Sequence, residues 1–252
     1  ATQDRLQETM LGPLEKARAA GGTYDQPWWA KPEAIEVWGP VLEKEDVLIL
    51  DDFLPQQAVY ALAAAVQREK SSMAPGRTDS KLSALGRGDS IAWADAQKVP
   101  ELGPLIENLN ALVGGMMSLP QEAVQARLQR VSAFSDAQLA VFPGDAATDD
   151  ARYIRHVDNE DGKNGRLLTC TFYLNEGWDT RQHGGELRIF EPDQRTVKAD
   201  IAPVMNRLAV FFSDSSVPHE VRAARRERSA ITIWYLDQEA HNAYHNAEES
   251  GQ

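Results

Sequence analysis

Cysteine and long hydrophobic runs are almost absent from this sequence. The 252 residues include one cysteine, Cys170, so the chain cannot form an internal disulfide. This scarcity is typical of a reducing compartment, and we expect Cys170 to be a small core residue. No run of about eighteen apolar residues occurs, so we expect no membrane-spanning helix. Residues 1–16 carry charges throughout and lack the apolar segment of a signal peptide, which predicts a cytoplasmic or nuclear protein.

Basic residues are also few. Lys and Arg number 26 against 38 Asp and Glu, which gives a net charge of −12. Nucleic-acid phosphates and anionic membranes are bound through Lys and Arg, so this balance argues against both as main partners. A neutral or basic protein substrate is better tolerated, although the acidity also has a simpler explanation as a means of staying soluble. Hydrophobic residues make up 42% of the chain, which is enough to bury a core.

The first half of the chain predicts helices, one buried strand and a long polar loop. Apolar and Ala-rich periodicity predicts helices at Gln56–Glu69 and Leu102–Met117, and Val47–Leu50 is typical of a buried strand. Trp28, Trp29 and Trp38 lie in a proline-rich connector and are expected to be packing residues. Loops as long as residues 71–88 are usually functional in compact domains, so this loop is the natural lid over a site.

The second half predicts short strands separated by turns. Apolar strand patterns recur in five segments, at residues 138–142, 167–174, 186–190, 207–212 and 229–236. Strands at this spacing argue for a sandwich or barrel. We therefore expect a mainly β fold with supporting helices. Its core would be a double-stranded β-helix, a cupin-like jelly roll, with N-terminal helices packed on it. The expected organisation is an extension over 1–45, a main domain over 46–240 (helical support 46–120, jelly-roll core 127–237) and an acidic tail over 241–252.

Two histidines and one carboxylate form a candidate metal site. His156 and Asp158 are two residues apart, which in extended chain places both side chains on one face. His219 follows after Pro218, and two imidazoles with one carboxylate are the facial triad that holds non-haem Fe(II). Only a closed or folded-over sheet brings positions so distant in sequence to one metal. The turn after His219 predicts that His219 and Arg228 lie on neighbouring antiparallel strands of one hairpin.

Arg228 indicates the kind of cosubstrate that would bind beside the iron. It begins a strand pattern in which Arg228, Thr232 and Trp234 share one face. A guanidinium there can hold a carboxylate through two hydrogen bonds, and the hydroxyls of Tyr173 and Thr232 are placed to join it. A polar cluster inside an apolar barrel needs a partner, and a bound dicarboxylate would supply it. Iron beside a carboxylate-binding arginine predicts an oxygenase that consumes 2-oxoglutarate.

The ordered motifs resemble the HIF-type prolyl 4-hydroxylases, which belong to the Fe(II)/2-oxoglutarate dioxygenases. The resemblance covers roughly residues 46–237 and is densest after Gln138. It is carried by five stretches: His156–Asn159, Arg166–Asn175, Gly184–Phe190, Pro218–Val221 and Arg228–Tyr235. It implies a prolyl 4-hydroxylase that acts on proline in an intracellular protein, with Fe(II), 2-oxoglutarate and O2, ascorbate as reductant and oxygen sensing as a role. Succinate would be the product of the cosubstrate.

The resemblance also implies residue roles. His156, Asp158 and His219 would bind iron. Arg228 would pair with the distal carboxylate of 2-oxoglutarate, helped by Tyr173 and Thr232, and Trp234 would line the cosubstrate pocket. Four further residues are implied as substrate-binding: Arg87, Asp89, Trp93 and Arg166. With substrate present, Asp89 would pair with Arg166 and fix the loop.

One departure and two alternatives follow. The relatives carry a tyrosine before Pro-Gly, where this chain has Phe142, and the lost hydroxyl would weaken 2-oxoglutarate binding. His183, His241 and His245 are expected to be exposed rather than metal ligands. Within the superfamily, the alternative function is hydroxylation of another residue or of a free amino acid. From another class, it is a cupin-like metal-binding sensor without turnover, against which Arg228 speaks.

Overall fold

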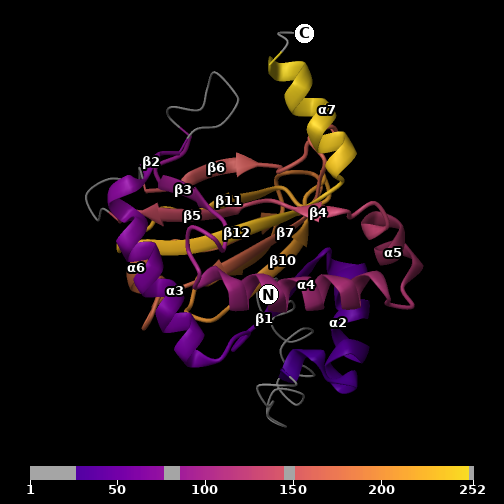
Figure 1. Cartoon of the computed structure of the whole chain (residues 1–252), viewed down its shortest axis with the longest axis horizontal. Coiled ribbons are helices and arrows are strands. Elements are labelled where there is room, and N and C mark those ends of the chain that lie inside the picture. Colours follow the sequence, from indigo (N-terminus) through magenta and orange to yellow (C-terminus); the bar gives the residue numbers. More distant parts are fainter. Residues whose placement is uncertain (1–26, 77–85, 145–150, 250–252) are drawn as a thin grey trace.

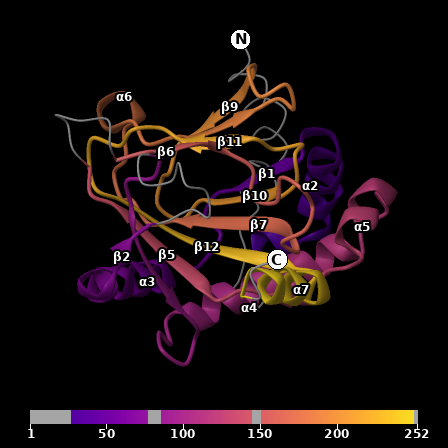
Figure 2. The ribbon, with the colours of Figure 1, turned by 90° about the horizontal axis from the view of Figure 1, so that it is seen from above.

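The computed structural model describes residues 27–76, 86–144 and 151–249. Two antiparallel sheets form its centre, and Figure 2 shows them as facing layers. The larger sheet runs in the order β1 (Val47–Leu50), β10 (Leu208–Phe212), β7 (Arg166–Tyr173), β12 (Arg228–Leu236), β5 (Ala137–Phe142), β3 (Ser90–Ala94) and β2 (Ala74–Pro75), with β4 (Ala133–Phe134) paired to β12. The smaller sheet runs β6 (Tyr153–His156), β11 (His219–Val221), β8 (Leu187–Phe190) and β9 (Val197–Ile201).

Helices cover the outer face of the larger sheet. They are α2 (Pro32–Glu45), α3 (Gln56–Glu69), α4 (Leu102–Met117) and α5 (Glu122–Leu128), and Figure 1 shows α3 and α4 lying across the strands. Short helices are η1 (Trp28–Ala30), η2 (Lys70–Ser72) and α6 (Thr180–His183), and α7 (Gln238–Glu249) follows the last strand. This arrangement confirms the jelly roll with supporting helices. No helix in the described ranges is long and apolar enough to cross a membrane.

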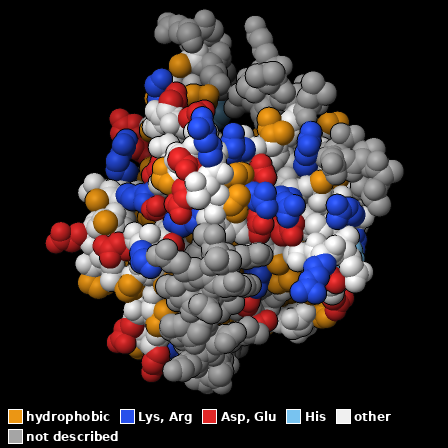
Figure 3. Space-filling model, turned by 180° about the vertical axis from the view of Figure 1, so that it is seen from behind, with side chains coloured by type: hydrophobic (Ala, Val, Ile, Leu, Met, Phe, Trp, Pro, Cys, Tyr) orange, Lys and Arg blue, Asp and Glu red, His pale blue; other side chains and the backbone are white. Residues whose placement is uncertain are grey.

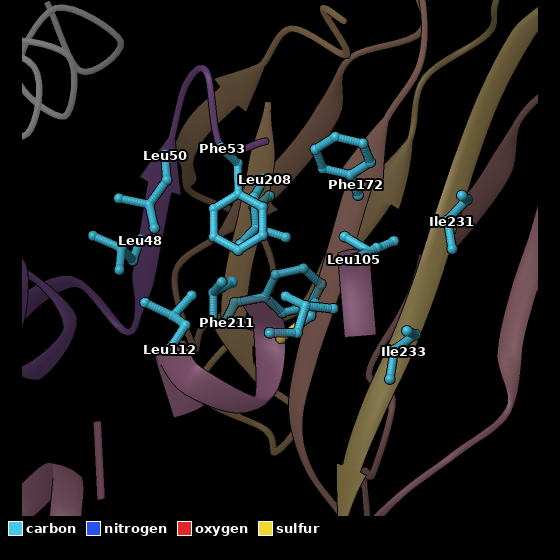
Figure 4. Close-up of a cluster of buried hydrophobic side chains, with 14 of the residues drawn as sticks. Leu48, Leu50, Phe53, Leu105, Leu112, Phe172, Leu208, Phe211, Ile231 and Ile233 are labelled. Carbon is cyan, nitrogen blue, oxygen red and sulfur yellow. The ribbon is translucent and has the colours of Figure 1, made fainter. Parts of the chain in front are cut away.

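The core lies between α4 and the larger sheet. Leu105, Leu109 and Leu112 recur at helical spacing on α4 and are buried. Figure 4 shows Leu105 and Leu112 among side chains from β1, β7, β10 and β12, such as Phe172 and Phe211. Burying one leucine side chain contributes about 2 kcal/mol, so this layer fixes the sheet that carries Arg228.

The aromatic connector before the first strand packs as expected. Trp28, Trp29 and Trp38 are all buried. The indole N–H of Trp29 donates to the Phe53 carbonyl at 3.0 Å, and that of Trp38 donates to the Trp29 carbonyl at 3.0 Å. These bonds satisfy the polar end of each ring, which is the condition for burying tryptophan. The three residues are therefore packing residues.

One prediction about topology is wrong. His219 and Arg228 do not lie on one hairpin, because β11 pairs with β6 and β8 in the smaller sheet. Arg228 begins β12, which pairs with β5 and β7 in the larger sheet. The segment between them crosses from one layer to the other instead of folding back. The two residues consequently reach the site from opposite walls.

The structure describes the expected lid, N-terminal extension and C-terminal tail only in part. Residues 77–85 of the expected lid and residues 1–26 of the expected N-terminal extension lie outside the described residues. Residues 238–249 form α7, so most of the expected acidic tail is helical, and His241 is half-buried with Nδ1 bonded to the Asn164 carbonyl. On the face seen in Figure 3, acidic and basic side chains are mixed, so the net negative charge does not form one continuous patch there.

Candidate active site

The His-Asp-His set converges between the two sheets. His156 ends β6 and His219 begins β11, and the two are Cα partners across this strand pair. Asp158 lies in the turn after β6 and places Oδ1 3.7 Å from Nε2 of His156 and 3.9 Å from Nε2 of His219. One ligand atom from each residue lies within 4.8 Å of the others, the only such metal-capable group in the described ranges. The spacing suits a first-row metal ion.

Backbone carbonyls set the tautomer of both histidines. Nδ1 of His156 lies 2.9 Å from the Ile154 carbonyl, and Nδ1 of His219 lies 2.9 Å from the Val217 carbonyl. A carbonyl only accepts, so each Nδ1 carries the proton and each Nε2 offers its lone pair to the centre. Burial, followed by the proximity of His219, lowers the pKa of His156. The neutral imidazole that a metal requires is thus favoured.

Asp158 has two differently placed oxygens. Its Oδ1 faces the histidines, whereas Oδ2 accepts from the Thr169 hydroxyl at 2.7 Å and from Trp234 Nε1 at 3.1 Å. Burial acts to raise the pKa of Asp158, but His219, His156, Arg166 and the Thr169 hydrogen bond together outweigh it and the pKa is lowered. The side chain is therefore a carboxylate, which completes a set of two imidazoles and one anion.

Arg228 is a buried cation on the opposite wall. It is 2% exposed, and its Nε donates to the Gly185 carbonyl at 2.8 Å. Its guanidinium carbon lies 5.2 Å from the ring centres of both Phe142 and Tyr173. Burial lowers the pKa of Arg228, and no carboxylate in the described ranges forms an ion pair with it. A buried charge of this kind calls for an anion.

Tyr173 lies beside this cation, and Thr232 is on the same strand, four residues further along β12. The Tyr173 hydroxyl is buried near Arg228 without a hydrogen-bond partner of good geometry. Burial raises its pKa, so it stays a neutral hydroxyl that can donate. Thr232 bonds to Thr171 at 3.1 Å across β12 and β7. An unsatisfied donor beside a buried guanidinium fits the carboxylate of a dicarboxylic acid such as 2-oxoglutarate.

Gly185 has a reason to be glycine. Its φ is +74°, and an added Cβ would come within 3.3 Å of Arg228 Cδ and 3.0 Å of the Trp178 ring. Its carbonyl also receives the Arg228 Nε bond. Glycine at this position therefore allows the backbone to come close to the arginine side chain. His183 is half-buried, not exposed as expected, because its Nδ1 accepts from the Asp179 amide at 3.0 Å.

Arg87 and Asp89 lie together and form an ion pair with each other. Arg87 donates from Nε to Asp89 Oδ1 at 2.6 Å and from Nη2 to Oδ2 at 2.9 Å. Nη2 also donates to Gln138 Oε1 at 2.8 Å, and the guanidinium lies over the Tyr153 ring at 4.7 Å. Tyr153 in turn stacks on His156 with ring centres 3.8 Å apart. In this structure, the partner of Asp89 is therefore Arg87, not Arg166, and the pair supports the wall beside the metal ligands.

Breaking this pair is expected to reduce stability. Asp89 is 4% exposed, so Asp89→Ala would leave the Arg87 charge buried without its partner, which destabilises by about 3 kcal/mol. Urea unfolding of Asp89→Ala, Arg87→Leu and the double variant measures this. We expect the double variant to lose clearly less than the sum of the singles. Unchanged stability in the Asp89→Ala protein would contradict the structural role.

Trp93 and Arg166 lie at the outer side of the site. Trp93 is 43% exposed, and its ring centre lies 5.9 Å from that of Trp234. The Arg166 guanidinium lies 4.3 Å from the Trp234 ring. Both side chains therefore lie between the protein surface and Trp234, which donates a hydrogen bond to Asp158. A position at the edge of the site suits contact with an incoming substrate.

Several site residues were missed by sequence reasoning. Gln138, Tyr153 and Thr169 contact the predicted site residues, but no role was assigned to them. Strand alternation places Thr169 on the same face as Tyr173, so a signal existed for it. The contacts of Gln138 and Tyr153 depend on how Arg87 folds over two strands, which no local pattern reveals. Cys170, by contrast, is buried as expected, and burial raises the pKa of its thiol.

The fold and the site together define a class of protein. A jelly roll that holds two histidines and one aspartate beside a deep arginine is the arrangement of an Fe(II)- and 2-oxoglutarate-dependent oxygenase. Residues 137–236, which run from β5 to the end of β12, match the model of the 2OG-Fe(II) oxygenase superfamily. The family uses Fe(II), 2-oxoglutarate and O2, and the His-Asp-His set fits the iron.

The relatives of this chain include prolyl hydroxylases. Egl nine homolog 1 of Rattus norvegicus is 34% identical over 234 residues, which are 90% of this chain and 65% of that protein. A prolyl hydroxylase from Trichoplax adhaerens, solved with a hypoxia inducible factor peptide fragment, has a TM-score of 0.70 and 26% identity, covering 83% of this chain and 91% of that one. A prolyl-4-hydroxylase of Pseudomonas putida has a TM-score of 0.66 and 29% identity, covering 80% and 98%.

The chain is shorter than its curated relatives. It spans between 52% and 65% of the length of the Egl nine homolog 1 proteins from three mammals. The family match extends from β5 to the end of β12 and therefore includes the His-Asp-His set and Arg228. The comparisons therefore bear on the site, and the activity of the chain follows as a proposal.

Proposed function

We propose that this protein is an Fe(II)- and 2-oxoglutarate-dependent prolyl 4-hydroxylase that acts on proline in an intracellular protein. The observation that carries the proposal is the presence of two complementary sites in one jelly roll. The His156, Asp158 and His219 set supplies a metal site, and buried Arg228 supplies an anion site on the facing sheet. Metal binding alone needs no buried arginine, so the pair of sites favours an oxygenase over a cupin-like sensor.

The roles of the residues follow from their positions. His156, Asp158 and His219 would hold Fe(II), which when bound supplies the oxidative chemistry that couples 2-oxoglutarate decarboxylation to hydroxylation. Arg228 and the Tyr173 hydroxyl would bind the distal carboxylate of the cosubstrate and fix its orientation. Thr232 would remain beside it through its bond to Thr171. Buried Phe142 and Trp234 would keep water out of the pocket.

A polypeptide substrate is supported by the outer side of the site. Trp93 is a large exposed ring next to Trp234, and Arg166 lies over the ring of Trp234 as well. Exposed aromatic and arginine side chains are common anchors for peptides. The Trichoplax relative was solved with a peptide fragment, which is consistent with this class of substrate. Arg87 and Asp89 would then shape the wall and not grip the peptide directly.

The proposal also includes the kind of partner and the cell compartment. Acidic and basic side chains are mixed on the face seen in Figure 3, and acidic residues outnumber basic ones in the chain, which favours a protein over nucleic acid as partner. The single cysteine is buried and free, which suits the cytoplasm or the nucleus. Hydroxylation of a residue other than proline, or of a free amino acid, is the alternative that the same site chemistry allows.

A mass-spectrometric assay tests the proposal. The full chain is incubated with Fe(II), ascorbate and a pool of peptides from its source cells, with and without 2-oxoglutarate, and gained oxygen is mapped by tandem spectra. We expect oxygen on proline only when 2-oxoglutarate is present. Oxygen on another residue would keep the iron chemistry and overturn the substrate. Absence of both oxidation and succinate would favour the sensor.

Phe142 offers a variant with a gain of function. Phe142 is the Cα partner of Arg228 on β5, and its ring lies 5.2 Å from the guanidinium. Phe142→Tyr would add a hydroxyl at the anion site, so we expect 2-oxoglutarate to bind about five-fold more tightly, the effect of one hydrogen bond of about 1 kcal/mol. Tyr173→Phe is the matched opposite and should weaken binding. Calorimetric titration with 2-oxoglutarate measures both, and weaker binding by the Phe142→Tyr protein would contradict this.

A further inference from the structure

The two oxygens of Asp158 face different surroundings. Oδ1 lies 3.7 Å and 3.9 Å from the two imidazole Nε2 atoms. Oδ2 points away from that centre and accepts two hydrogen bonds, from Thr169 and Trp234. A carboxylate that is free to rotate can offer one or both oxygens to a metal. Here, one oxygen is already engaged before any metal arrives.

The first donor is itself held by a second hydroxyl. Thr169 gives its one hydroxyl proton to Asp158 Oδ2, because an ionised carboxylate only accepts. The Ser213 hydroxyl lies 2.8 Å from the Thr169 hydroxyl and must therefore donate to it. Both residues are buried, at 2% and 1% exposure. The hydrogen bonds therefore run in one direction: Ser213 donates to Thr169, and Thr169 donates to Asp158.

The second donor comes from the neighbouring strand. Trp234 on β12 and Thr169 on β7 are Cα partners, so both side chains rise from one place on the same face of the sheet. The indole N–H can only donate. Trp93 and Arg166 contact the indole ring at 5.9 Å and 4.3 Å, which limits its rotation. The ring was expected to line the cosubstrate pocket, but its polar atom is directed at Asp158.

We propose that Thr169 and Trp234 are positioning residues for the metal. They hold Oδ2 so that Asp158 offers Oδ1 alone, which keeps the remaining coordination positions free for other ligands. The inference rests on the proposed function, because it assumes that the His-Asp-His set binds a metal. Ser213 acts one step behind by orienting the Thr169 proton. Outer-shell partners of metal ligands typically change metal affinity by roughly ten- to a hundred-fold.

Direct metal titration tests the proposal without any turnover. Co(II) is added to the intact chain under inert atmosphere, and its visible absorption bands report affinity and coordination. We expect Thr169→Val and Trp234→Phe each to bind Co(II) roughly ten-fold more weakly, since each removes one donor and keeps the shape. Thr169→Ser should restore near-normal affinity, because it returns the hydroxyl. Trp38→Phe, which removes an indole hydrogen bond far from the site, should change nothing.

The outcomes separate this inference from the proposed function. Normal Co(II) affinity and unchanged bands in both the Thr169→Val and the Trp234→Phe proteins would overturn the positioning role and leave the metal site intact. Lost 2-oxoglutarate affinity with normal Co(II) affinity in Trp234→Phe would also overturn it and restore the pocket-wall role. Failure of the unmodified protein to bind Co(II) would instead overturn the proposed function.

Discussion

Arg228→Ala is expected to remove 2-oxoglutarate binding while metal binding persists. Arg228 is buried on the larger sheet, whereas two of the three metal-site residues come from strands of the smaller one. Truncating one partner of a buried charge pair weakens binding by about 3 kcal/mol, on the order of a hundred-fold. Calorimetric titration with 2-oxoglutarate in the presence of Mn(II) measures the loss. Succinate formation at ordinary cosubstrate concentrations should fall with it.

A conservative variant sharpens this prediction. Arg228→Lys keeps the positive charge but loses the planar fork that binds both carboxylate oxygens, so we expect an intermediate affinity. Metal affinity should be normal in both variants, because Arg228 bonds to the Gly185 carbonyl and not to any of the three ligands. If Arg228→Ala kept full 2-oxoglutarate affinity, the assignment of the cosubstrate site would be wrong.

Asp158→Ala is expected to have the second large effect. Asp158 is the only anion of the metal-capable group, and its Oδ1 lies within 4 Å of both imidazole nitrogens. Its removal deletes one ligand and leaves two neutral imidazoles to face a divalent ion. The loss of metal affinity should exceed the roughly hundred-fold upper range seen for outer-shell partners. Co(II) titration measures this, and activity should fall below detection.

Asp200→Asn is the matched control for Asp158. Asp200 is also a partly buried aspartate with two hydrogen bonds, both to Arg188 at 2.7 Å, but it lies on β9, away from the histidines. The substitution should leave Co(II) affinity unchanged. Equal losses in both variants would mean that the effect comes from general destabilisation of the smaller sheet and not from a missing ligand.

The elements with the strongest local signals were predicted closely. The helices Gln56–Glu69 and Leu102–Met117 and the strand Val47–Leu50 have the predicted bounds. The two helices show apolar or Ala-rich periodicity and the strand is a continuous apolar run, so local chemistry decides where each of them forms. By contrast, β9 and α7 were not predicted. Val197–Ile201 alternates apolar and charged residues, which is a strand signal that was overlooked, and Gln238–Glu249 has few apolar residues.

The site was predictable where residue type alone carries the chemistry. Two histidines, an aspartate and a strand-borne arginine suffice to predict metal and anion sites, and the structure brings all four to the space between the sheets. The pairing partners were not predictable. Whether Asp89 meets Arg87 or Arg166, and which sheet β11 joins, depends on long-range packing that no short pattern encodes.

The most direct test of the account follows a single oxygen atom. The full chain is supplied with a proline-containing peptide identified in its source cells, with Fe(II), 2-oxoglutarate and isotopically heavy O2. The account predicts one heavy oxygen on proline for each succinate formed, with both signals lost in the Arg228→Ala protein. Label on proline that does not depend on 2-oxoglutarate, or succinate without any peptide oxidation, would contradict it.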